Sequence, residues 1–322
     1  MNPVLVEVSR GGRVESAHRG AFVVADAAGG VVLQAGDIDA AVFPRSAVKA
    51  LQALPLVESG AADRLGLSDA EIALACASHG GEPAHVATAR SMLAKAGRDA
   101  ACLECGAHWP SDARAARALA AAGEAPTALH NNCSGKHAGF ICLACACGDD
   151  PAGYVGPDHP TMRRVTAALA EATGTRLDAD NRGTDGCSIP TYAIPLRALA
   201  GAFARFGTAG GAAARLRAAV AANPFMVGGS DRFDTVLMTA LGARAFSKGG
   251  AEGVHCAALP ELGLGIAVKC DDGAGRAADL VCAALIARSL GDGVPESLLR
   301  PELRNWNGIA VGALRAAGPL AA

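Results

Sequence analysis

The sequence predicts an α+β protein in which strands from both ends of the chain form one antiparallel sheet. Two β-rich regions, residues 1–42 and 245–322, contain short apolar runs separated by Gly-rich turns. Between them, residues 43–244 consist mainly of segments with helical composition. Short turns between consecutive strands favour antiparallel pairing, and segregated helices favour an α+β architecture. We therefore expect one folded unit over residues 1–322, with a sheet part and a mainly helical part.

The individual elements follow from local patterns. Each strand is predicted where β-branched residues end at a Gly-containing turn: residues 4–8, 20–26, 31–35, 254–259 and 264–270. Each helix is predicted from composition and capping signals: residues 46–57, 112–122, 160–172, 196–206, 212–222, 231–241 and 276–290. Ser68 and Glu71 fit a capping box, and Gly174 should end the helix over 160–172.

Composition excludes several classes of protein. Of the 322 residues 51% are hydrophobic and 19% are charged, which favours a large core over disorder. A net charge of −2 without long runs of one sign argues against nucleic-acid and membrane-surface binding. No signal peptide or membrane span is predicted, so we expect a cytoplasmic protein whose 11 cysteines are mostly free thiols.

The first candidate for chemistry is the S-x-x-K motif formed by Ser46 and Lys49 at the start of the helix predicted over 46–57. A serine hydroxyl is a weak nucleophile unless a base lies within hydrogen-bonding distance. A lysine can be that base when burial or a nearby cation keeps it uncharged. This motif is typical of penicillin-binding proteins and β-lactamases. The alternative is a capping serine followed by a solvated lysine.

Two further segments fit the same chemistry. Lys248 begins a K-G-G triplet just before the predicted strand 254–259, where S-x-x-K enzymes have K-T-G. Ser78 and His79 follow an apolar run, and Ser78 is a candidate for a proton relay, an oxyanion or substrate contact, or a second nucleophile. The alternatives are a surface turn for the first segment and a helix cap for the second.

Two Gly-rich polar segments each contain one cysteine, Cys133 and Cys187. Together with Lys136 or His137, the two thiols could bind zinc and leave a position open to water or substrate. The alternative is that both cysteines are simply buried. The C-x-x-C pair at 102–105 and the cysteines at 142–147 are predicted to be structural, because neither group has a partner at zinc-finger spacing.

Taken in order, these segments resemble the type II asparaginase family described from rhizobia, and the similarity extends over most of the chain. The segments concerned are residues 45–49, 77–79, 132–137, 183–187 and 248–250. The resemblance implies a fold related to serine β-lactamases and glutaminases and, usually, a homodimer. It also implies the serine–lysine pairs Ser46 with Lys49 and Ser78 with Lys248. A zinc site would map onto Cys133, Lys136 and Cys187.

The resemblance implies that L-asparagine is hydrolysed to L-aspartate and ammonia. We expect Ser46 to attack the side-chain amide after giving its proton to Lys49. Charge makes Arg45 and Asp185 candidates to bind the α-carboxylate and α-amine, and His79 is a further candidate substrate contact. The zinc would position substrate rather than generate hydroxide.

Three alternatives remain at this stage. A glutaminase or other ω-amidase would use the same residues with a deeper pocket. A penicillin-interacting acyltransferase would also contain S-x-x-K, but it should be exported. A non-catalytic protein could bind zinc or an amino acid at the same residues.

Overall fold

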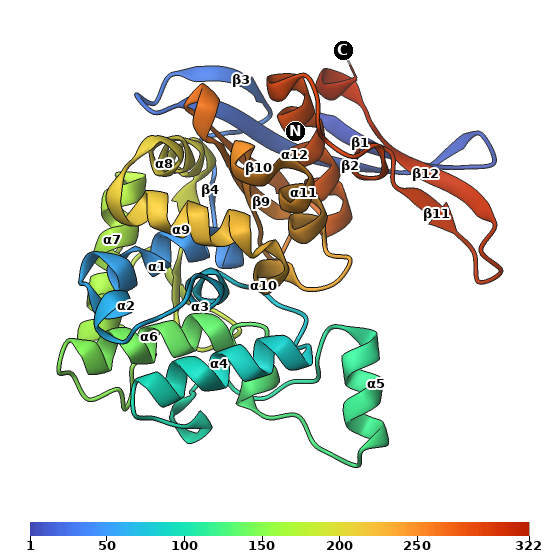
Figure 1. Cartoon of the computed structure of the whole chain (residues 1–322). Helices are drawn as coiled ribbons and strands as arrows, with labels where there is room; N and C mark the ends of the chain where they lie inside the picture. Colours follow the sequence, from blue (N-terminus) through green and yellow to red (C-terminus); the bar gives the residue numbers. More distant parts are fainter. Residues whose placement is uncertain (322) are drawn as a thin grey trace. The chain divides into compact units, whose positions relative to one another are not determined.

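The computed structural model describes residues 1–321, which divide into two compact units. Unit 1 comprises Met1–Ala47, Ala193–Thr208 and the described residues from Leu237 onward. Unit 2 comprises Val48–Tyr192 and Ala209–Val236. Both helices and an antiparallel sheet are present, which confirms the α+β prediction (Figure 1).

Unit 1 contains an eight-stranded sheet in the order β11-β12-β1-β2-β10-β9-β8, with β3 also paired to β2. Every pair is antiparallel, and the strands come from both ends of the chain. The strands are β1 (Val4–Arg10), β2 (Arg13–Asp26), β3 (Val31–Ala35), β8 (Phe246–Gly249), β9 (Val254–Leu259), β10 (Leu264–Cys270), β11 (Glu302–Arg304) and β12 (Ala310–Ala316).

The sequence prediction missed part of this sheet. β9 and β10 have the predicted bounds, whereas β2 begins at Arg13 instead of residue 20. The first residues of β2 are exposed on both faces, so they lack the apolar alternation that identifies a strand. β11 and β12 were not predicted. β12 pairs with β1 from the other end of the chain, and no local pattern indicates such a contact.

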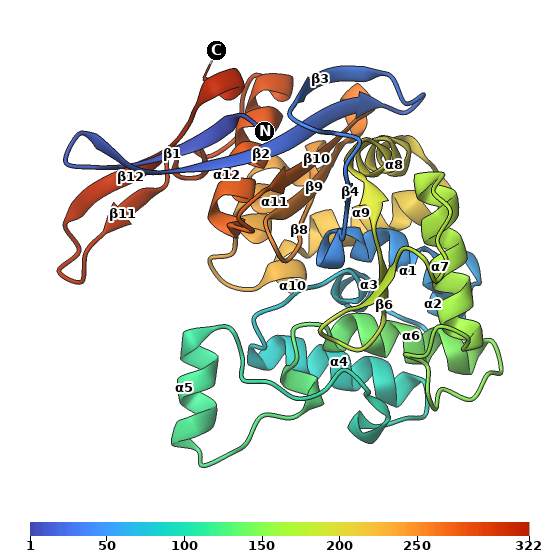
Figure 2. The same ribbon diagram turned by 180° about the vertical axis from the view of Figure 1, so that it is seen from behind.

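Two helices cover opposite faces of the central strands: α8 (Leu196–Thr208) and α12 (Gly275–Leu290) (Figure 2). A Cβ on Gly265 of β10 would collide with the backbone of Ala200 and Ala204 in α8, so a glycine is needed there. Side chains alternate along a strand, and the register pairs Gly265 with Ala258 of β9. Even-numbered residues of β9 therefore face α8, and odd-numbered residues, His255 among them, face α12.

Smaller elements complete unit 1. β4 (Ala41–Val42) pairs with β7 (Ile194–Pro195). The helical turns are α13 (Glu296–Leu299), η4 (Gly242–Arg244), η5 (Pro260–Leu262) and η6 (Gly318–Leu320). Two further elements, η1 (Arg45–Val48) and α11 (Phe233–Leu241), contain the positions where the chain passes from one unit to the other.

Unit 2 is mainly helical. Its α-helices are α1 (Lys49–Glu58), α2 (Ala61–Arg64), α3 (Asp69–Ala75), α4 (Pro83–Lys95), α5 (Ala113–Ala121), α6 (Ser134–Ala146), α7 (Pro160–Thr173), α9 (Gly211–Ala222) and α10 (Pro224–Gly228). The short elements are η2 (Ala100–Cys102), η3 (Ala128–His130) and the paired strands β5 (Arg182–Thr184) and β6 (Pro190–Tyr192). In the described part of the chain, no helix has both the length and the apolarity needed to cross a bilayer.

Local signals explain two of the helix ends in unit 2. Ser68 and Glu71 form the predicted capping box: the Ser68 N–H donates to Glu71 Oε2 at 2.7 Å, and the Glu71 N–H donates to Ser68 Oγ at 3.4 Å. α7 ends as predicted at Gly174, whose φ of 63° is in the left-handed region that glycine tolerates.

The helix predicted over 46–57 begins later than expected. Arg45–Val48 forms a 3₁₀ turn, and the α-helix starts at Lys49. Val48, the residue before the α-helix, has a φ of −93° and a ψ of 10°, which are not α-helical values, so the helix cannot extend back through it. Ser46 therefore belongs to a tight turn before the helix, and Lys49 is the first residue of the helix proper.

Candidate active site

Lys49 lies at the centre of a polar cluster in unit 2 and is fully buried. Its Nζ lies 2.5 Å from Ala77 O, 2.8 Å from Ser78 Oγ and 3.1 Å from Cys133 Sγ. These three partners come from the segment after α3 and from the residue that precedes α6. The structure thus joins Lys49 to Ser78. The implied pairs of Ser46 with Lys49 and of Ser78 with Lys248 stay predictions.

The three partners of Lys49 differ in what they can do. The carbonyl of Ala77 only accepts hydrogen bonds, and a thiolate at Cys133 likewise only accepts. Ser78 is the remaining partner, and its hydroxyl can either donate or accept. Ser78 is also half-buried, in contrast to Lys49. The contact of Ser78 with Lys49 is therefore the one whose hydrogen bond can run in either direction while Cys133 is a thiolate.

A second cation and a second thiol adjoin this cluster. Lys136 in the first turn of α6 is buried, and its Nζ donates to Cys187 Sγ at 3.0 Å. A hydrogen bond from Cys187, followed by the positive charges of Lys49 and Lys136, holds the pKa of Cys133 well below its ordinary value. The same hydrogen bond, together with burial, raises the pKa of Cys187. The hydrogen bond and the two lysines thus favour the thiolate form of Cys133 over that of Cys187.

The charge of Lys136 depends on that thiolate. Burial by itself would lower the pKa of Lys136, but the negative charge of Cys133 and the contact with Cys187 raise it. The cluster is therefore a compact set of opposite charges in which each lysine lies against one cysteine sulfur. Such an arrangement is stable only when the charges remain paired, because an isolated buried charge is strongly unfavourable.

Local geometry explains how the cysteines reach this position. A Cβ on Gly135 would collide with the Leu74 side chain and carbonyl, so glycine allows the start of α6 to pack against the end of α3. Cys187 is presented by a tight turn in which the Asp185 N–H donates to Ile189 O at 2.8 Å. Ser188 in that turn has a φ of 75°, a backbone strain of the kind that is found at functional sites.

His79 is fully buried, and both of its ring nitrogens have partners. Nδ1 accepts from the Gly81 N–H at 3.1 Å, so the proton is on Nε2, which donates to Ser134 Oγ at 3.0 Å. Burial holds the pKa of His79 well below its ordinary value. The ring is therefore neutral and connects the Ser78 segment to α6. Its predicted contact with substrate stays a prediction.

Unit 1 contains the other predicted residues: Arg45, Ser46 and Lys248. Ser46 lies in a turn closed by the Ala47 N–H donating to Pro44 O at 3.0 Å. A Cβ on Gly250 would lie 2.6 Å from that same Pro44 oxygen, so the residue after β8 is packed against the segment that contains Ser46. The second glycine of the K-G-G triplet thus permits a close backbone approach, as a K-T-G-like element requires.

Lys248 itself is buried and precedes β9 as predicted, but it also lies within a strand of its own, β8, which was not predicted. Its Nζ donates to Gly249 O at 2.6 Å, and its backbone pairs with Cys256 of β9. The predicted site residues therefore form two groups. Lys49, Ser78, Cys133, Lys136 and Cys187 meet in unit 2, with Asp185 in the Cys187 turn, while Ser46 and the Lys248 strand are neighbours in unit 1.

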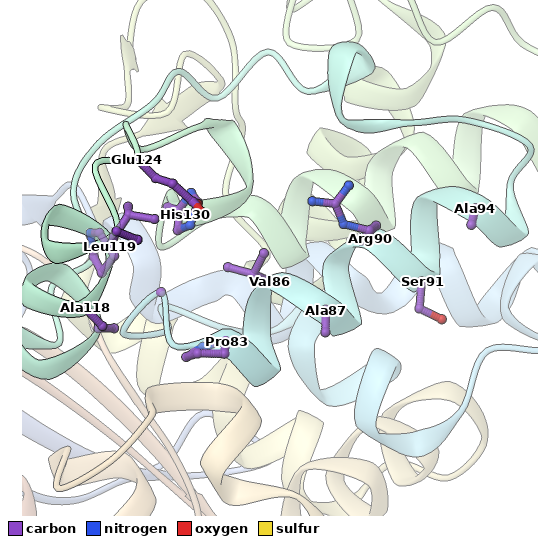
Figure 3. A pocket seen from close by; sticks show the side chains of 14 residues that line it. Pro83, Val86, Ala87, Arg90, Ser91, Ala94, Ala118, Leu119, Glu124 and His130 are labelled. Atoms are coloured by element: carbon purple, nitrogen blue, oxygen red, sulfur yellow. The ribbon is translucent and has the colours of Figure 1, made fainter.

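A groove of about 670 Å³ lies elsewhere in unit 2, between α4 and α5 (Figure 3). Its walls are mostly alanine and other small apolar side chains, with Arg90, Glu124 and His130 as the charged or titratable groups. None of the predicted site residues lines it. The candidate active site is therefore the cluster around Lys49, and this groove is separate from it.

The predicted zinc ligands are Cys133, Lys136 and Cys187. Within residues 1–321 no three or more His, Cys, Asp or Glu side chains are grouped as a metal site. The predicted set contains two cysteines and a lysine, and these three side chains do converge through the Lys136–Cys187 contact and the hydrogen bond between the two thiols. Two sulfurs and one amine can supply three positions of a tetrahedral zinc site.

A serine hydroxyl within hydrogen-bonding distance of a buried lysine amine is compatible with nucleophilic catalysis. The family model for L-asparaginase II matches residues 6–316, and the chain belongs to that family. Membership makes the protein an amidohydrolase with a small-molecule substrate. A comparison with curated protein sequences gave no match.

Proposed function

We propose that the protein is an L-asparaginase that hydrolyses the side-chain amide of L-asparagine through a serine acyl-enzyme. The observation that supports a serine–lysine mechanism is the 2.8 Å contact between Lys49 Nζ and Ser78 Oγ. It provides a buried amine with a hydroxyl partner that can accept or return a proton. Family membership supplies the reaction class.

The proposed reaction has two stages. In the form that reacts, Lys49 is the neutral amine. Ser46 Oγ attacks the amide carbon, its proton passes to Lys49, and the tetrahedral intermediate expels ammonia with that proton. A β-aspartyl ester then remains on Ser46, and water cleaves it to release L-aspartate. Ser78 acts as the proton carrier at Lys49. Lys248, held against the Gly249 carbonyl in β8, orients the substrate. Preorganised donors around the oxyanion would lower the barrier most strongly.

Charge assigns the proposed substrate contacts. Arg45 precedes the nucleophile and is the candidate for the α-carboxylate. Asp185 belongs to the strained turn that presents Cys187 and is the candidate for the α-amine. His79 positions the Ser78 segment from behind through Ser134, and we retain it as a candidate for contact with substrate.

We further propose that Cys133, Lys136 and Cys187 bind zinc. Binding requires one proton to leave Cys187 and one to leave Lys136, and the charge of the cation favours both losses. Zinc bound there would supply a Lewis acid that orients the substrate. Lys49 and Ser78 perform the proton transfers in this scheme.

Three finer proposals accompany the function. The fold is related to that of serine β-lactamases and glutaminases. The protein is a homodimer, and it acts in the cytoplasm. Family membership and the antiparallel sheet of unit 1 are compatible with the first of these, and size-exclusion chromatography with light scattering would test the second.

The decisive experiment measures ammonia release from asparagine, glutamine and related amides, with and without a metal chelator. We expect asparagine to be the best substrate and Ser46→Ala to abolish turnover while the thermal unfolding temperature is kept. Mass spectrometry of quenched reactions should find the aspartyl adduct on Ser46. Full activity of Ser46→Ala would falsify the nucleophile assignment. A preference for glutamine over asparagine would show that the protein is a glutaminase and not an asparaginase.

A further inference from the structure

Ser247 in unit 1 is a buried serine whose hydrogen-bond partners have no role in the reaction described above. Ser247 Oγ of β8 lies 2.8 Å from His255 Nε2 of β9, and His255 Nδ1 lies 2.9 Å from Asp279 Oδ1 of α12. Ser247 and His255 are fully buried. The Asp279 side chain is 38% exposed. The three residues therefore form a continuous chain of hydrogen bonds from the surface to the strand that contains Lys248.

The direction of these hydrogen bonds follows from their chemistry. An ionised carboxylate only accepts, so His255 Nδ1 carries the proton and donates to Asp279. In a neutral imidazole the other nitrogen then accepts, and the Ser247 hydroxyl donates to it. This polarity is the same as in a Ser-His-Asp catalytic triad. Ser247, however, has no exposed surface that a substrate could reach, so a nucleophilic role does not fit its position.

The position of Ser247 on β8 indicates a structural role for the three residues. Neighbouring residues of a strand point to opposite faces, so Ser247 faces α12 and Lys248 faces the α8 side. β8 has four residues and pairs only with β9, at the edge of the sheet. A slip of one residue would exchange the two side chains between the faces. The hydrogen bond from Ser247 to His255 ties β8 to β9 through side chains and so opposes such a slip.

We propose that Ser247, His255 and Asp279 are positioning residues, which hold the edge strand β8 in register and thereby place the Lys248 amine. His255 is opposite Gly249 in the ladder, and Gly250 packs against the Pro44 carbonyl beside Ser46. The same tether therefore also holds the end of β8 against the Ser46 turn. The catalytic consequence rests on the proposed function, but the structural consequence does not.

Amide hydrogen exchange of the full-length protein tests the structural consequence. Removal of the hydroxyl in Ser247→Ala should raise exchange at residues 246–250 about tenfold, the effect expected for one lost buried hydrogen bond. β10, in the centre of the sheet, should exchange as in the wild type. Asp279→Asn should also raise exchange at residues 246–250. Asp279→Glu, which keeps the carboxylate, should leave exchange there close to that of the wild type. Ser289→Ala is the matched control, because its hydroxyl bonds only within α12, to Leu285 O.

Unchanged exchange in both Ser247→Ala and Asp279→Asn would overturn the proposal, as would an increase spread evenly over the sheet. Labelling of Ser247 by a fluorophosphonate would also overturn it in favour of a nucleophile. In the activity arm, Ser247→Ala should lower kcat for asparagine about tenfold with KM kept. If the wild type releases no ammonia from any amide, the proposed function fails while the exchange result still decides the role of Ser247.

Discussion

Each unit of the molecule contains a buried serine–base contact, and the two contacts differ in charge and access. In unit 2 the half-buried Ser78 meets Lys49, next to a thiolate and a second lysine. In unit 1 the fully buried Ser247 meets His255, which is oriented by Asp279. The first group combines cations with a thiolate and a hydroxyl that is partly accessible. The second is a complete relay that is closed to substrate.

The comparison shows that hydrogen-bond geometry alone does not identify a reactive serine. Distances of 2.8 Å occur in both groups. Reactivity requires in addition that the hydroxyl be reached by substrate and that its base exchange a proton during the reaction. The Lys49 cluster satisfies the second condition through Ser78, the one partner of Lys49 that can donate or accept.

The largest expected difference is between Ser78→Ala and Ser247→Ala. Loss of the Ser78 hydroxyl removes the proton carrier at Lys49, so kcat for ammonia release should fall roughly 10³-fold. Ser247→Ala should lower it only about tenfold, because positioning is impaired while the chemistry is retained. Steady-state kinetics on both variants, with thermal unfolding as the control for folding, measure the contrast. Equal losses would remove the distinction between the two serines.

A second difference concerns the thiols of the two units. In metal-free protein at pH 7, Cys133 should be a thiolate, since its pKa is held well below the ordinary value by the Cys187 hydrogen bond and the two lysines. Cys256 in unit 1 should be a thiol, because burial raises its pKa to about 12. Removal of both members of the pair, in Cys133→Ala with Cys187→Ala, should therefore lose one thiolate signal in ultraviolet difference spectra.

Cys256→Ala is the matched control for that measurement and should lose no thiolate signal at pH 7. If the double variant also leaves the spectrum unchanged, the charge cluster around Lys49 and Lys136 does not exist as described. The same comparison tests the zinc proposal, because only the double variant should lower the zinc content measured by atomic emission.

The smallest expected difference is in stability. Glu71 in unit 2 is buried; burial would raise its pKa, but hydrogen bonds from Lys95 and from Ser68 and Ser91 lower it overall. Glu71→Gln should lower the free energy of unfolding by about 1–3 kcal/mol at pH 7. Asp272 in unit 1 contacts His18 but is half-exposed, so Asp272→Asn should change it by less than about 1 kcal/mol. Urea unfolding measures both.

The sign of the pH dependence follows from the lowered pKa of Glu71. Because an unfolded chain binds the proton more readily, the stabilisation is present above the ordinary pKa of 4.5 and is lost as the pH falls through the lower folded value. The stability gap between wild type and Glu71→Gln should therefore shrink in acid. A gap of constant size from neutral to strongly acidic pH would contradict the assignment.

Several elements could be predicted because their signals are local. The bounds of β9 and β10, the Ser68 capping box and the end of α7 at Gly174 each depend on residues a few positions apart. The start of α1 was missed because the non-helical backbone of Val48 is not visible in the residue type. β11 and β12 were missed because β12 finds its partner, β1, at the opposite end of the chain.

Motifs predicted the candidate residues, and the structure adds contacts that no motif indicated. Lys49 contacts Ser78 and Cys133, which are 29 and 84 positions distant, and its predicted pairing with Ser46 stays a prediction. The relay of Ser247, His255 and Asp279 had no sequence signal, since it joins two strands and a helix. Substrate contacts, zinc binding and the acylated serine stay predictions.

By itself, the sequence determined the α+β class, most helix and strand positions, and which residue types are available for acyl transfer. Those features depend on periodicity, capping and turn chemistry, which act between neighbours in the chain. Only the tertiary structure decided which serine meets which base, because that depends on the close packing of α3 against α6 and of β8 against β9. The physical reason is that hydrogen bonds act over about 3 Å in space, whatever the separation of the residues along the chain.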